Sequence, residues 1–407
     1  MTVTRLVGDS RDVLATLPEK HFHAVITSPP YMGLRNYGGG AGEIGQEKVL
    51  DCLAWARNEP PCRECYICAL LSVFGGKSAN DGVWRVLRDD GVLWANLGDS
   101  YAANRSYQVP STKAGDVGNS APSRVPLGLK PKDLCMVPAR LALALQAAGW
   151  YVRCDIIWAK ANPMPESVTD RPTKAHEYVW MLTKSERYYY DHVAVMEPSV
   201  RPGETQVIGG SKALNDTIGE GDPRFRNGSE QWGRSITCGD SRNRRSVWEI
   251  NAKPCSEAHF AVMPAALVEP CLLAATSQKG CCGACGAPWK RVTSSTRTFE
   301  SGSGKAGNLP AGKNGAAMQG GGETLDIRRG PVVTTETLGW EPSCTCTDAM
   351  VQPCRCLDPF GGSGTVALVA AEHGRDCTLI DLVLHNMEII AVNRLKRVQP
   401  RLAMEVI

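Results

Sequence analysis

Short apolar runs that end in polar or glycine-bearing turns recur along the chain. The first is Arg5-Leu6-Val7, which is followed by the turn Gly8-Asp9-Ser10 and by apolar residues at helical spacing up to Pro18. The second, Ala24-Val25-Ile26, contains no polar residue, which is typical of a short buried strand. The chain therefore begins with a strand, an acidic turn, a short helix and a second strand, as expected of an α/β fold.

The same alternation continues through the middle of the chain. We expect a turn at Asp89-Asp90-Gly91, between a helix that ends at Leu87 and a strand over residues 92–97. Polar residues at the carboxyl end of such a strand are site candidates, and Gly98-Asp99-Ser100-Tyr101 lies there. Apolar spacing further predicts helices over 134–148 and 265–276, strands over 151–158 and 178–182, and strand residues at Tyr188-Tyr189-Tyr190.

Two prolines follow the buried strand at 24–26. In Thr27-Ser28-Pro29-Pro30-Tyr31 they exclude both a helix and ladder pairing, so the chain leaves the strand as a fixed extended loop. Such a loop presents a hydroxyl, rigid carbonyls and an aromatic ring to one small space. This suits a site that grips a planar ring carrying an exocyclic amine, although a strand that is merely capped by prolines has the same pattern. The glycine-rich residues 33–42 predict a mobile loop beside it.

A glycine loop near the carboxyl end of the chain carries a second signal. Residues 358–365, Asp-Pro-Phe-Gly-Gly-Ser-Gly-Thr, stand between an apolar run and a helix over 366–372, and a second strand over 377–380 ends in Asp381. This order is half of a nucleotide-binding βαβ unit, in which glycines let the backbone approach a ligand and an acid reaches ribose hydroxyls. The loop lacks G-x-G-x-x-G and Gly-Lys-Ser/Thr, so neither a dinucleotide nor a phosphate cradle is favoured.

Composition narrows the class of protein. The chain has 407 residues, 43% of them hydrophobic, and a net charge of only +3, so overall charge does not indicate a polyanionic partner. We find no signal-peptide pattern and no apolar run near the roughly 18 residues of a membrane span, so we expect a soluble cytoplasmic protein with no membrane partner. In a reducing compartment, its 17 cysteines suggest metal ligands or buried thiols rather than disulfides.

Two groups of cysteines have the spacing of metal ligands. A C-x2-C pair, a long insert and a C-x-C pair predict tetrahedral structural zinc bound by Cys282, Cys285, Cys344 and Cys346, with Cys281 able to replace a neighbour. The second group is tight enough for a metal, although positions three apart also share a helical face, so buried free thiols remain the alternative. Its members are Cys52, Cys62, Cys65 and Cys68.

Arginines and aromatic residues gather between residues 201 and 245, where apolar periodicity disappears. Arginine with interleaved aromatics suits phosphate contacts and stacking on bases, although an ordinary solvated loop has a similar composition. The candidate DNA-binding residues are Arg224, Arg226, Arg234, Arg242, Arg244 and Arg245. Residues 300–330 are glycine-rich with few apolar side chains, which predicts a disordered segment or a flexible flap.

The two loops together resemble a known family. Residues 358–365 resemble the S-adenosylmethionine motif of amino-group DNA methyltransferases, and residues 27–31 resemble their catalytic motif. The catalytic motif comes first, which resembles the permuted β-class order. The resemblance spans nearly the whole chain. It implies a Rossmann-like, S-adenosylmethionine-dependent methyltransferase fold with a mostly parallel central sheet. We expect this fold to carry loop-rich insertions and, from the cysteine spacing, a small zinc-binding knuckle, which is an elaboration seen in some members of the family.

The resemblance also implies roles for individual residues. The catalytic residues would be Ser28, Pro29, Pro30 and Tyr31, and residues 81–101 would form the strand-end region of the target pocket. The cofactor-binding residues would be Asp9, Phe260, Asp358, Phe360, Gly361, Gly362, Ser363, Gly364, Thr365 and Asp381.

The chemistry of amine methylation fits these residues. The lone pair of a base's exocyclic amine is delocalised, and hydrogen bonds to the Ser28 hydroxyl and the Pro29 carbonyl would localise it and hold the nitrogen in place. Tyr31 could stack on the base, which must first leave the duplex. Ser28, rather than Asp or Asn, resembles members that modify cytosine N4. Adenine N6 is the alternative, and a catalytically silent nucleic-acid-binding module or an enzyme that methylates RNA or protein are further ones.

These expectations divide the chain into three parts. Residues 1–198 would form the catalytic half, 199–250 a target-recognition insert, and 251–407 the cofactor-binding half, with the zinc knuckle and a flexible insert at about 281–346. The implied partners are double-stranded DNA and a cognate restriction endonuclease, with the enzyme a monomer or a homodimer.

Overall fold

The computed structural model describes most of the chain, in two compact units. The larger unit comprises Met1–Ala194, Arg245–Lys290 and Glu341–Ile407, and the smaller comprises Val195–Arg244 and Arg291–Trp340. Within these units the described residues are 1–32, 43–47, 49–62, 64–102, 128–163, 165–202, 205–208, 234–237, 239–252, 262–298, 332–347, 350–383 and 403–406. The predicted loop at 33–42 and the predicted flap at 300–330 lie outside them.

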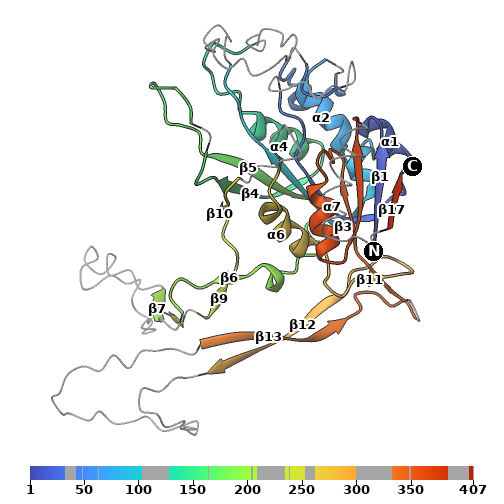
Figure 1. The fold of residues 1–407 in the computed structure, drawn as a ribbon, viewed down its shortest axis with the longest axis vertical. Coiled ribbons are helices and arrows are strands. Elements are labelled where there is room, and N and C mark those ends of the chain that lie inside the picture. The colour runs from blue at the N-terminus through green and yellow to red at the C-terminus, as the bar shows by residue number, and fades with distance from the viewer. Residues whose placement is uncertain are drawn as a thin grey trace, which may run out of the picture. The chain divides into compact units, whose positions relative to one another are not determined.

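A nine-stranded sheet forms the larger unit, in the order β10-β4-β5-β3-β2-β15-β16-β1-β17 (Figure 1). The sheet is mixed, because β5 runs antiparallel to its neighbours β3 and β4 while the other pairings are parallel. The predicted α/β fold is therefore confirmed. The strands are β1 Thr2–Val7, β2 Phe22–Thr27, β3 Leu87–Leu97, β4 Tyr151–Ala159, β5 His176–Thr183, β10 Val247–Glu249, β15 Arg355–Asp358, β16 Asp376–Asp381 and β17 Ala403–Val406.

Strands from the two ends of the chain interleave in this sheet. β15 lies between β2 and β16, with Ala24 opposite Cys356 and Val25 opposite Leu357. Because β2 and β15 are parallel, their carboxyl ends lie side by side at one edge of the sheet. The loops that follow β2 and β15 therefore start next to each other. Their first residues, Thr27 and Asp358, are 331 positions apart in the sequence.

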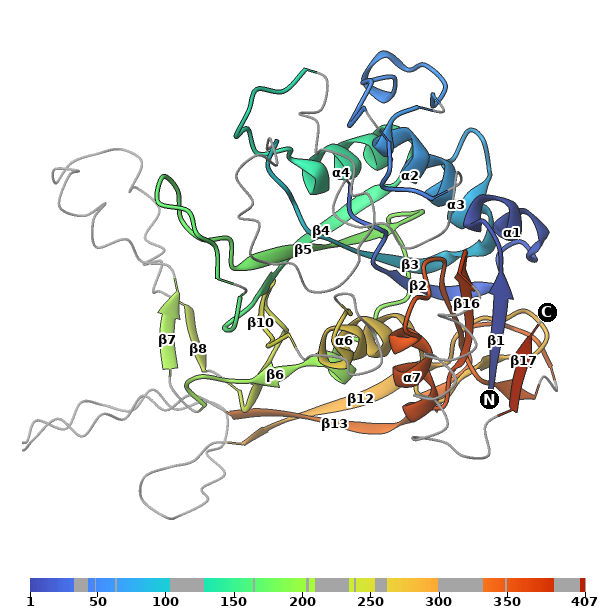
Figure 2. The ribbon, with the colours of Figure 1, turned by 45° about the horizontal axis from the view of Figure 1, so that its top comes forward.

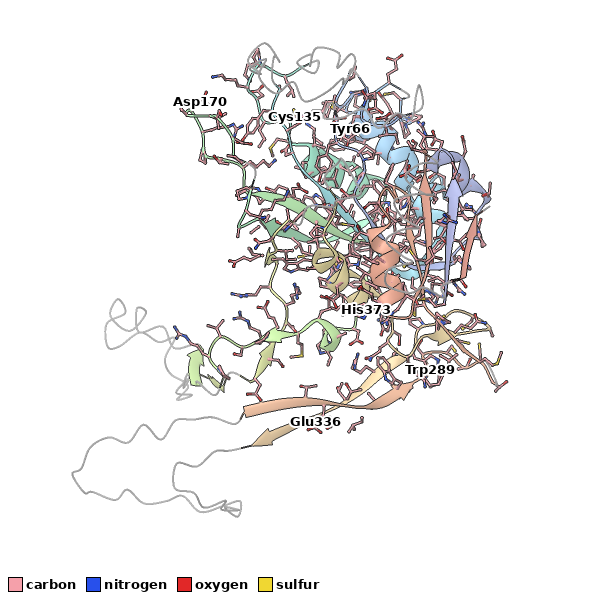
Figure 3. The ribbon with its side chains drawn as sticks, in the orientation of Figure 1. Tyr66, Cys135, Asp170, Trp289, Glu336 and His373 are labelled. Carbon is pink, nitrogen blue, oxygen red and sulfur yellow. The ribbon has the colours of Figure 1, made fainter. Side chains whose placement is uncertain are left out.

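Helices cover both faces of the sheet, with α1 to α4 on one face and α6 and α7 on the other (Figure 2). The core beneath the first layer includes fully buried Phe22, Tyr66 and Phe74, and Tyr66 lies within that helical layer in Figure 3. The helices are α1 Ser10–Thr16, α2 Tyr66–Phe74, α3 Gly82–Val86, α4 Val137–Ala147, α6 Ala265–Ala275 and α7 Thr365–Glu372. No helix in the described part of the chain is long and apolar enough to cross a membrane.

Two predictions about strands are wrong. Asp89-Asp90-Gly91 is not a turn, because β3 runs through it with a register shift between the pairs Phe22–Leu87 and Ala24–Val92. The charge of Asp89 is tolerated within the strand because Lys20 and Lys184 pair with its carboxylate at 2.6 and 2.9 Å.

The three tyrosines at 188–190 do not extend a strand. β5 ends at Thr183, before the tyrosines are reached. The backbone N–H of Tyr189 instead donates to the Asp90 carbonyl at 2.9 Å. The β-propensity of aromatic residues is overridden here by tertiary contacts.

The smaller unit is built from antiparallel strand pairs. The longest pair is β12 with β13, in which the Arg291 guanidinium lies 4.4 Å from the centre of the Trp340 ring and donates to the Thr337 hydroxyl at 2.9 Å. The pairs are β6 Glu197–Pro198 with β9 Ser241–Arg242, β7 Thr205–Ile208 with β8 Arg234–Thr237, and β12 Lys290–Thr298 with β13 Val332–Glu341.

Candidate active site

A cavity of about 510 Å³ opens at the carboxyl edge of the parallel strands in the larger unit. Open α/β sheets bind ligands at this edge, where neighbouring loops diverge. Residues 28–32, which follow β2, line the cavity together with residues 358–363 and Thr365 at the end of β15. The two predicted loops thus form one site, joined by Asp9 and Ser10 after β1, by Asp381 at the end of β16, and by residues at the ends of β3, β4 and β5.

The loop after β2 is fixed at both of its ends. Buried Thr27 donates a hydrogen bond of 2.6 Å from its hydroxyl to Asp358 Oδ1. Three residues further on, the Pro30 carbonyl accepts a hydrogen bond of 2.7 Å from the Tyr66 hydroxyl at the start of α2. Between these anchors the two prolines restrict the backbone, so Ser28 faces the cavity from a rigid support.

Tyr31 is held by a polar network on the neighbouring strands. Its hydroxyl donates to Glu177 Oε2 at 2.6 Å, and Asn96 Nδ2 donates to the same oxygen at 3.1 Å. Lys160 forms an ion pair with the other oxygen of Glu177. Burial, together with the nearby Glu177 carboxylate, raises the pKa of Tyr31 well above its usual range. Tyr31 therefore stays protonated and keeps donating to Glu177.

The Tyr31 ring lies against the backbone of Gly98. A Cβ atom at position 98 would come within 2.7 Å of Tyr31 Cε2, so a larger residue would displace the ring. Gly98 follows β3 directly, within the stretch 98–101 that the sequence marks as a site candidate. Gly98, Asp99 and Ser100 all line the cavity.

Sequence reasoning did not single out Glu177, Asn96 or Lys160. Asn96 and Lys160 lie at the carboxyl ends of β3 and β4, where the strand-end rule could have found them. Glu177 lies at the start of β5 and reaches the site because that strand is antiparallel. No local pattern in the sequence gives the direction of β5.

The glycine loop is closed onto β16 by backbone hydrogen bonds. Gly361 N–H donates to the Ile380 carbonyl at 2.7 Å, and Gly362 N–H donates to Asp381 Oδ2 at 2.7 Å. The other oxygen of Asp381 accepts from Val383 N–H at 2.8 Å. Gly362 and Gly364 have φ angles of 47° and 73°, which are left-handed values that favour glycine. Asp381 thus shapes the loop and also lines the cavity.

Asp358 lies at the junction of the two loops and is 4% exposed. Its Oδ1 accepts from the Thr27 hydroxyl and from Phe360 N–H at 3.0 Å. Burial raises the pKa of Asp358 to about 7, although these hydrogen bonds oppose the shift. At neutral pH the carboxyl is therefore partly protonated.

Asp9 and Ser10 bring α1 into the site. Asp9 caps the first turn of α1, accepting from Arg11 N–H at 2.9 Å and pairing with the Arg11 guanidinium. Burial would raise the pKa of Asp9, but the hydrogen bonds from Arg11 outweigh it and lower that pKa. The Ser10 hydroxyl donates to the Pro359 carbonyl, so the acidic turn is tied to the glycine loop.

Lys174 brings a buried cation to the cavity wall. Its Nζ atom is buried without a hydrogen-bond partner in the described part of the chain. Burial lowers the pKa of Lys174, and the nearby Asp99 and Glu177 oppose this shift.

Some predicted site residues fall outside this description. Phe260, Arg224 and Arg226 are not among the described residues. Arg234 lies in β8, and Arg242 in β9 forms an ion pair of 2.8 Å with Glu197. The two last candidates, Arg244 and Arg245, lie at the boundary between the two units. Contact of these arginines with DNA therefore stays a prediction.

The structure brings together the four cysteines predicted to bind zinc. The sulfur atoms of Cys282, Cys285, Cys344 and Cys346 all lie within 4.8 Å of one another. Short strands β11 Cys281–Cys282 and β14 Val351–Gln352 pair beside them.

Cys281 is not part of that set. Its sulfur lies in a separate buried group with His23 and Cys354. His23 Nδ1 accepts from Arg355 N–H at 3.0 Å, and its Nε2 lies 2.8 Å from the Gly286 carbonyl oxygen. Both ring nitrogens are thus engaged with the backbone, so this group suits a structural role rather than a metal.

Comparison with known proteins identifies the family. The N6/N4 methyltransferase model, described as DNA methylase, matches residues 22–282 of the chain. The chain belongs to this DNA methylase family. The matched range contains the Ser28–Tyr31 loop, Asn96 and Glu177. The glycine loop lies beyond the matched range, and it joins the matched part through β15 and the Thr27–Asp358 hydrogen bond.

Two type II methyltransferases are similar in sequence to this amino-group DNA methylase. It is 40% identical over 274 residues to the type II methyltransferase M.Cfr9I of Citrobacter freundii, covering 67% of this chain and 72% of that one. M.SmaI of Serratia marcescens, also a type II methyltransferase, is 39% identical over 276 residues, covering 68% and 76%. The solved PvuII DNA methyltransferase (cytosine-N4-specific) aligns over 100% of this chain and 95% of its own, with 14% identity and a TM-score of 0.47.

Proposed function

We propose that this DNA methylase transfers the methyl group of S-adenosylmethionine to N4 of cytosine in double-stranded DNA. The observation that carries the proposal is the single cavity lined by both the Ser28–Tyr31 loop and the glycine loop, which the Thr27–Asp358 hydrogen bond ties together. Methyl transfer needs an acceptor site and a donor site in contact, and two loops that meet in one cavity can provide them.

The glycine-loop side of the cavity suits the methyl donor. The cavity volume lies within the range of ligand pockets, about 300–1,000 Å³. Asp381 lines the cavity, and its carboxylate accepts from Gly362 N–H and Val383 N–H at the strand end where an acid can receive a hydrogen bond from a ligand hydroxyl. When bound, S-adenosylmethionine supplies a methyl group on a positively charged sulfur. The residues that would hold it are Asp9, Phe360, Gly361, Gly362, Ser363, Gly364, Thr365 and Asp381.

The Ser28 side of the cavity suits the target amine. An extruded cytosine could donate its two N4 hydrogens to the Ser28 hydroxyl and the Pro29 carbonyl, which would localise the nitrogen lone pair. Because the loop is anchored at Thr27 and Pro30, these acceptors are fixed before the base arrives. Tyr31 is held by Glu177 and can present its ring to the base.

Adenine N6 is the second candidate target, since the family model covers both amino groups. The choice of cytosine rests on serine at position 28. We further propose that the enzyme is the modification partner of a restriction endonuclease, as its relatives are type II methyltransferases. The arginines at positions 234, 242, 244 and 245 are proposed to contact DNA outside the cavity.

We also propose that Cys282, Cys285, Cys344 and Cys346 bind a structural zinc ion. Four sulfur atoms within 4.8 Å of one another match a tetrahedral thiolate site. The two pairs are far apart in sequence, so the metal would hold the base of the β12–β13 insert closed.

Nucleoside analysis tests the proposed reaction. Purified protein is incubated with unmethylated duplex DNA and S-adenosylmethionine carrying a labelled methyl group, and the DNA is digested to nucleosides. We expect the label in N4-methyl-2′-deoxycytidine. Label in N6-methyladenine would move the proposal to the second target, and DNA binding without any transfer would leave only a nucleic-acid-binding module. Label in the protein alone would refute DNA as the substrate, and so would label in RNA but not in DNA when RNA replaces the duplex in a parallel reaction.

A further inference from the structure

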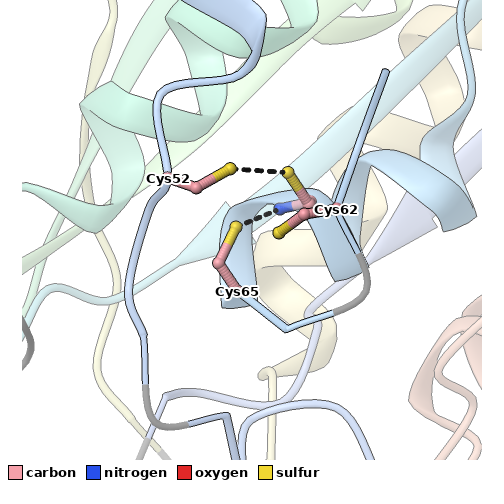
Figure 4. A group of neighbouring side chains, drawn as sticks. Cys52, Cys62 and Cys65 are labelled. Carbon is pink, nitrogen blue, oxygen red and sulfur yellow. Dashed lines mark hydrogen bonds between the residues drawn. The ribbon is translucent and has the colours of Figure 1, made fainter. Parts of the chain in front are cut away.

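A second cluster of four cysteines comes from the N-terminal part of the chain, far in sequence from Cys282, Cys285, Cys344 and Cys346. The sulfur atoms of Cys52, Cys62, Cys65 and Cys68 all lie within 4.8 Å of one another, and those of Cys52 and Cys68 are 3.5 Å apart. Figure 4 shows Cys52, Cys62 and Cys65 directing their sulfurs into one space. Cys65 and Cys68 are fully buried, and Cys52 and Cys62 are partly buried.

The arrangement is not that of buried thiols sharing one helical face. Cys65 is the N-cap of α2 and Cys68 lies in its first turn, but Cys52 and Cys62 come from the irregular chain before the helix. Four side chains from three separate stretches thus converge on one point. Only the last two positions follow from helical spacing.

The separation of the sulfurs suits a tetrahedral metal ion. A zinc ion bonded to four sulfurs at about 2.3 Å places them about 3.8 Å from one another. A disulfide would require two sulfurs at about 2.05 Å and would leave the other pair unexplained. The 3.5 Å between Cys52 and Cys68 lies near the first value, all the sulfurs lie within 4.8 Å of one another, and the all-sulfur donor set favours zinc over magnesium or calcium.

The four cysteines lie in a small apolar cluster of their own, and the segment before them is joined to the rest of the unit by buried Leu50 and by the Asp51–Arg140 ion pair of 3.2 Å. The local apolar cluster consists of Ala54 and the buried cysteines, with Val49 packed beside them. Leu53 adopts a left-handed φ angle of 57°, a conformation that costs energy for a residue with a bulky side chain. A small apolar cluster with a strained turn is the setting in which a metal commonly replaces a hydrophobic core.

We propose that Cys52, Cys62, Cys65 and Cys68 bind a second structural zinc ion. On binding, the four thiols lose their protons and the resulting thiolates close the tetrahedron, which couples metal affinity to local folding. The metal would fasten residues 49–62 to the first turn of α2. The assignment of this site rests neither on the proposed reaction nor on the first zinc site.

The second site lies next to Tyr66, which supports the loop after β2 in the active site. Tyr66 follows the ligand Cys65, its N–H donates to the Val49 carbonyl at 3.0 Å, and its hydroxyl donates to the Pro30 carbonyl. Next to it, Ile67 N–H donates to the Leu50 carbonyl at 3.1 Å. The zinc would therefore set the start of α2, from which Tyr66 supports the loop after β2.

Metal analysis of the full-length protein tests this proposal. Protein purified without added metal is measured for zinc and iron per chain by elemental mass spectrometry. We expect two zinc ions in the wild type, one in Cys62→Ser/Cys68→Ser, one in Cys282→Ser/Cys285→Ser, and none when all four substitutions are combined. The control is Cys154→Ser, at a partly buried cysteine outside the clusters, which should keep both ions.

Thiol labelling of the wild type keeps the test decisive if the double variants fail to fold. A thiol-alkylating reagent is applied to native protein, and the modified positions are mapped by mass spectrometry. We expect Cys52 and Cys62 to react more slowly than Cys154 until a zinc chelator is added. Chelator-independent labelling of Cys52 and Cys62 at the rate of Cys154 would overturn the proposal. So would iron in place of zinc, or full zinc retention in a folded Cys62→Ser/Cys68→Ser variant.

Discussion

The Thr27 hydroxyl donates a 2.6 Å hydrogen bond to the Asp358 carboxylate across 331 positions of sequence. Both residues are buried at the carboxyl ends of adjacent parallel strands, β2 and β15. This bond holds the loop that faces the target base next to the loop that would hold the methyl donor. The site therefore depends on the pairing of the first and last parts of the chain.

The raised pKa of Asp358 predicts a pH dependence of stability. The folded-state pKa of Asp358 is about 7, whereas an unfolded aspartate has a pKa of about 3.9. Between these two pH values the folded protein holds a proton that the unfolded chain has released. This stabilisation is complete below about pH 4 and is lost as pH rises through about 7.

Asp358→Asn, which cannot titrate, isolates this effect. We expect the free energy of unfolding of the wild type, minus that of the variant, to fall as pH rises from about 4 to about 7 and then to level off. Chemical denaturation of the cofactor-free proteins at a series of pH values measures it. A difference that stays constant across this window would show that Asp358 does not titrate there.

Ser28→Ala tests the acceptor for the target amine. Removing one preorganised hydrogen-bonding group from an active site typically lowers kcat by about 10²- to 10³-fold. We expect a loss of that order with the dissociation constant of S-adenosylmethionine unchanged, because Ser28 belongs to the loop after β2 and not to the glycine loop that would hold the cofactor. Single-turnover methylation and calorimetric binding measure the two quantities. Wild-type turnover in this variant would remove Ser28 from the mechanism.

Tyr66→Phe tests the support behind the catalytic loop. The substitution removes only the hydroxyl that donates to the Pro30 carbonyl, and a buried acceptor left unsatisfied costs about 1–3 kcal/mol. We expect kcat to fall, by up to about 10²-fold if the loop shifts, with a smaller change in KM and no loss of zinc. Tyr151→Phe, at a tyrosine that is 46% exposed on β4, is the matched control and should behave as the wild type.

Gly98→Ala tests the position of Tyr31. The added methyl would lie 2.7 Å from Tyr31 Cε2, so the ring must move and its hydrogen bond to Glu177 must lengthen. We expect reduced turnover and a destabilisation of about 1–3 kcal/mol, typical of an overpacked site. Gly339→Ala, where a methyl group would meet nothing within 4 Å, is the control. Equal activity of the two variants would show that the ring position is not needed for the reaction.

Local patterns in the sequence predicted the parts of the site that lie after parallel strands. The Ser28–Tyr31 loop and the glycine loop were both recognisable because an apolar run, a turn signal and special residues follow one another within about ten positions. Which strands are neighbours is a property of the whole sheet. The Thr27–Asp358 bond could therefore not be derived from the sequence, although each loop could.

The features that sequence reasoning missed depend on tertiary structure. Glu177 reaches the site from the start of β5, whereas the rule used for the sequence considers only residues at the carboxyl ends of strands. Asp89-Asp90-Gly91 has the composition of a turn but remains in a strand, since Lys20 and Lys184 neutralise Asp89 from outside β3. In both cases a contact from a distant segment overrides the local preference.

The most direct test of the central claim is sequencing of methylated DNA at single-base resolution. DNA from a host that expresses the wild type is compared with DNA from the same host expressing Ser28→Ala at equal protein level. We predict N4-methylcytosine at one recurring sequence in the first DNA and its loss in the second. Cytosine methylation that persists in the variant, or a wild-type host with no modified amine at any recurring site, would contradict the account.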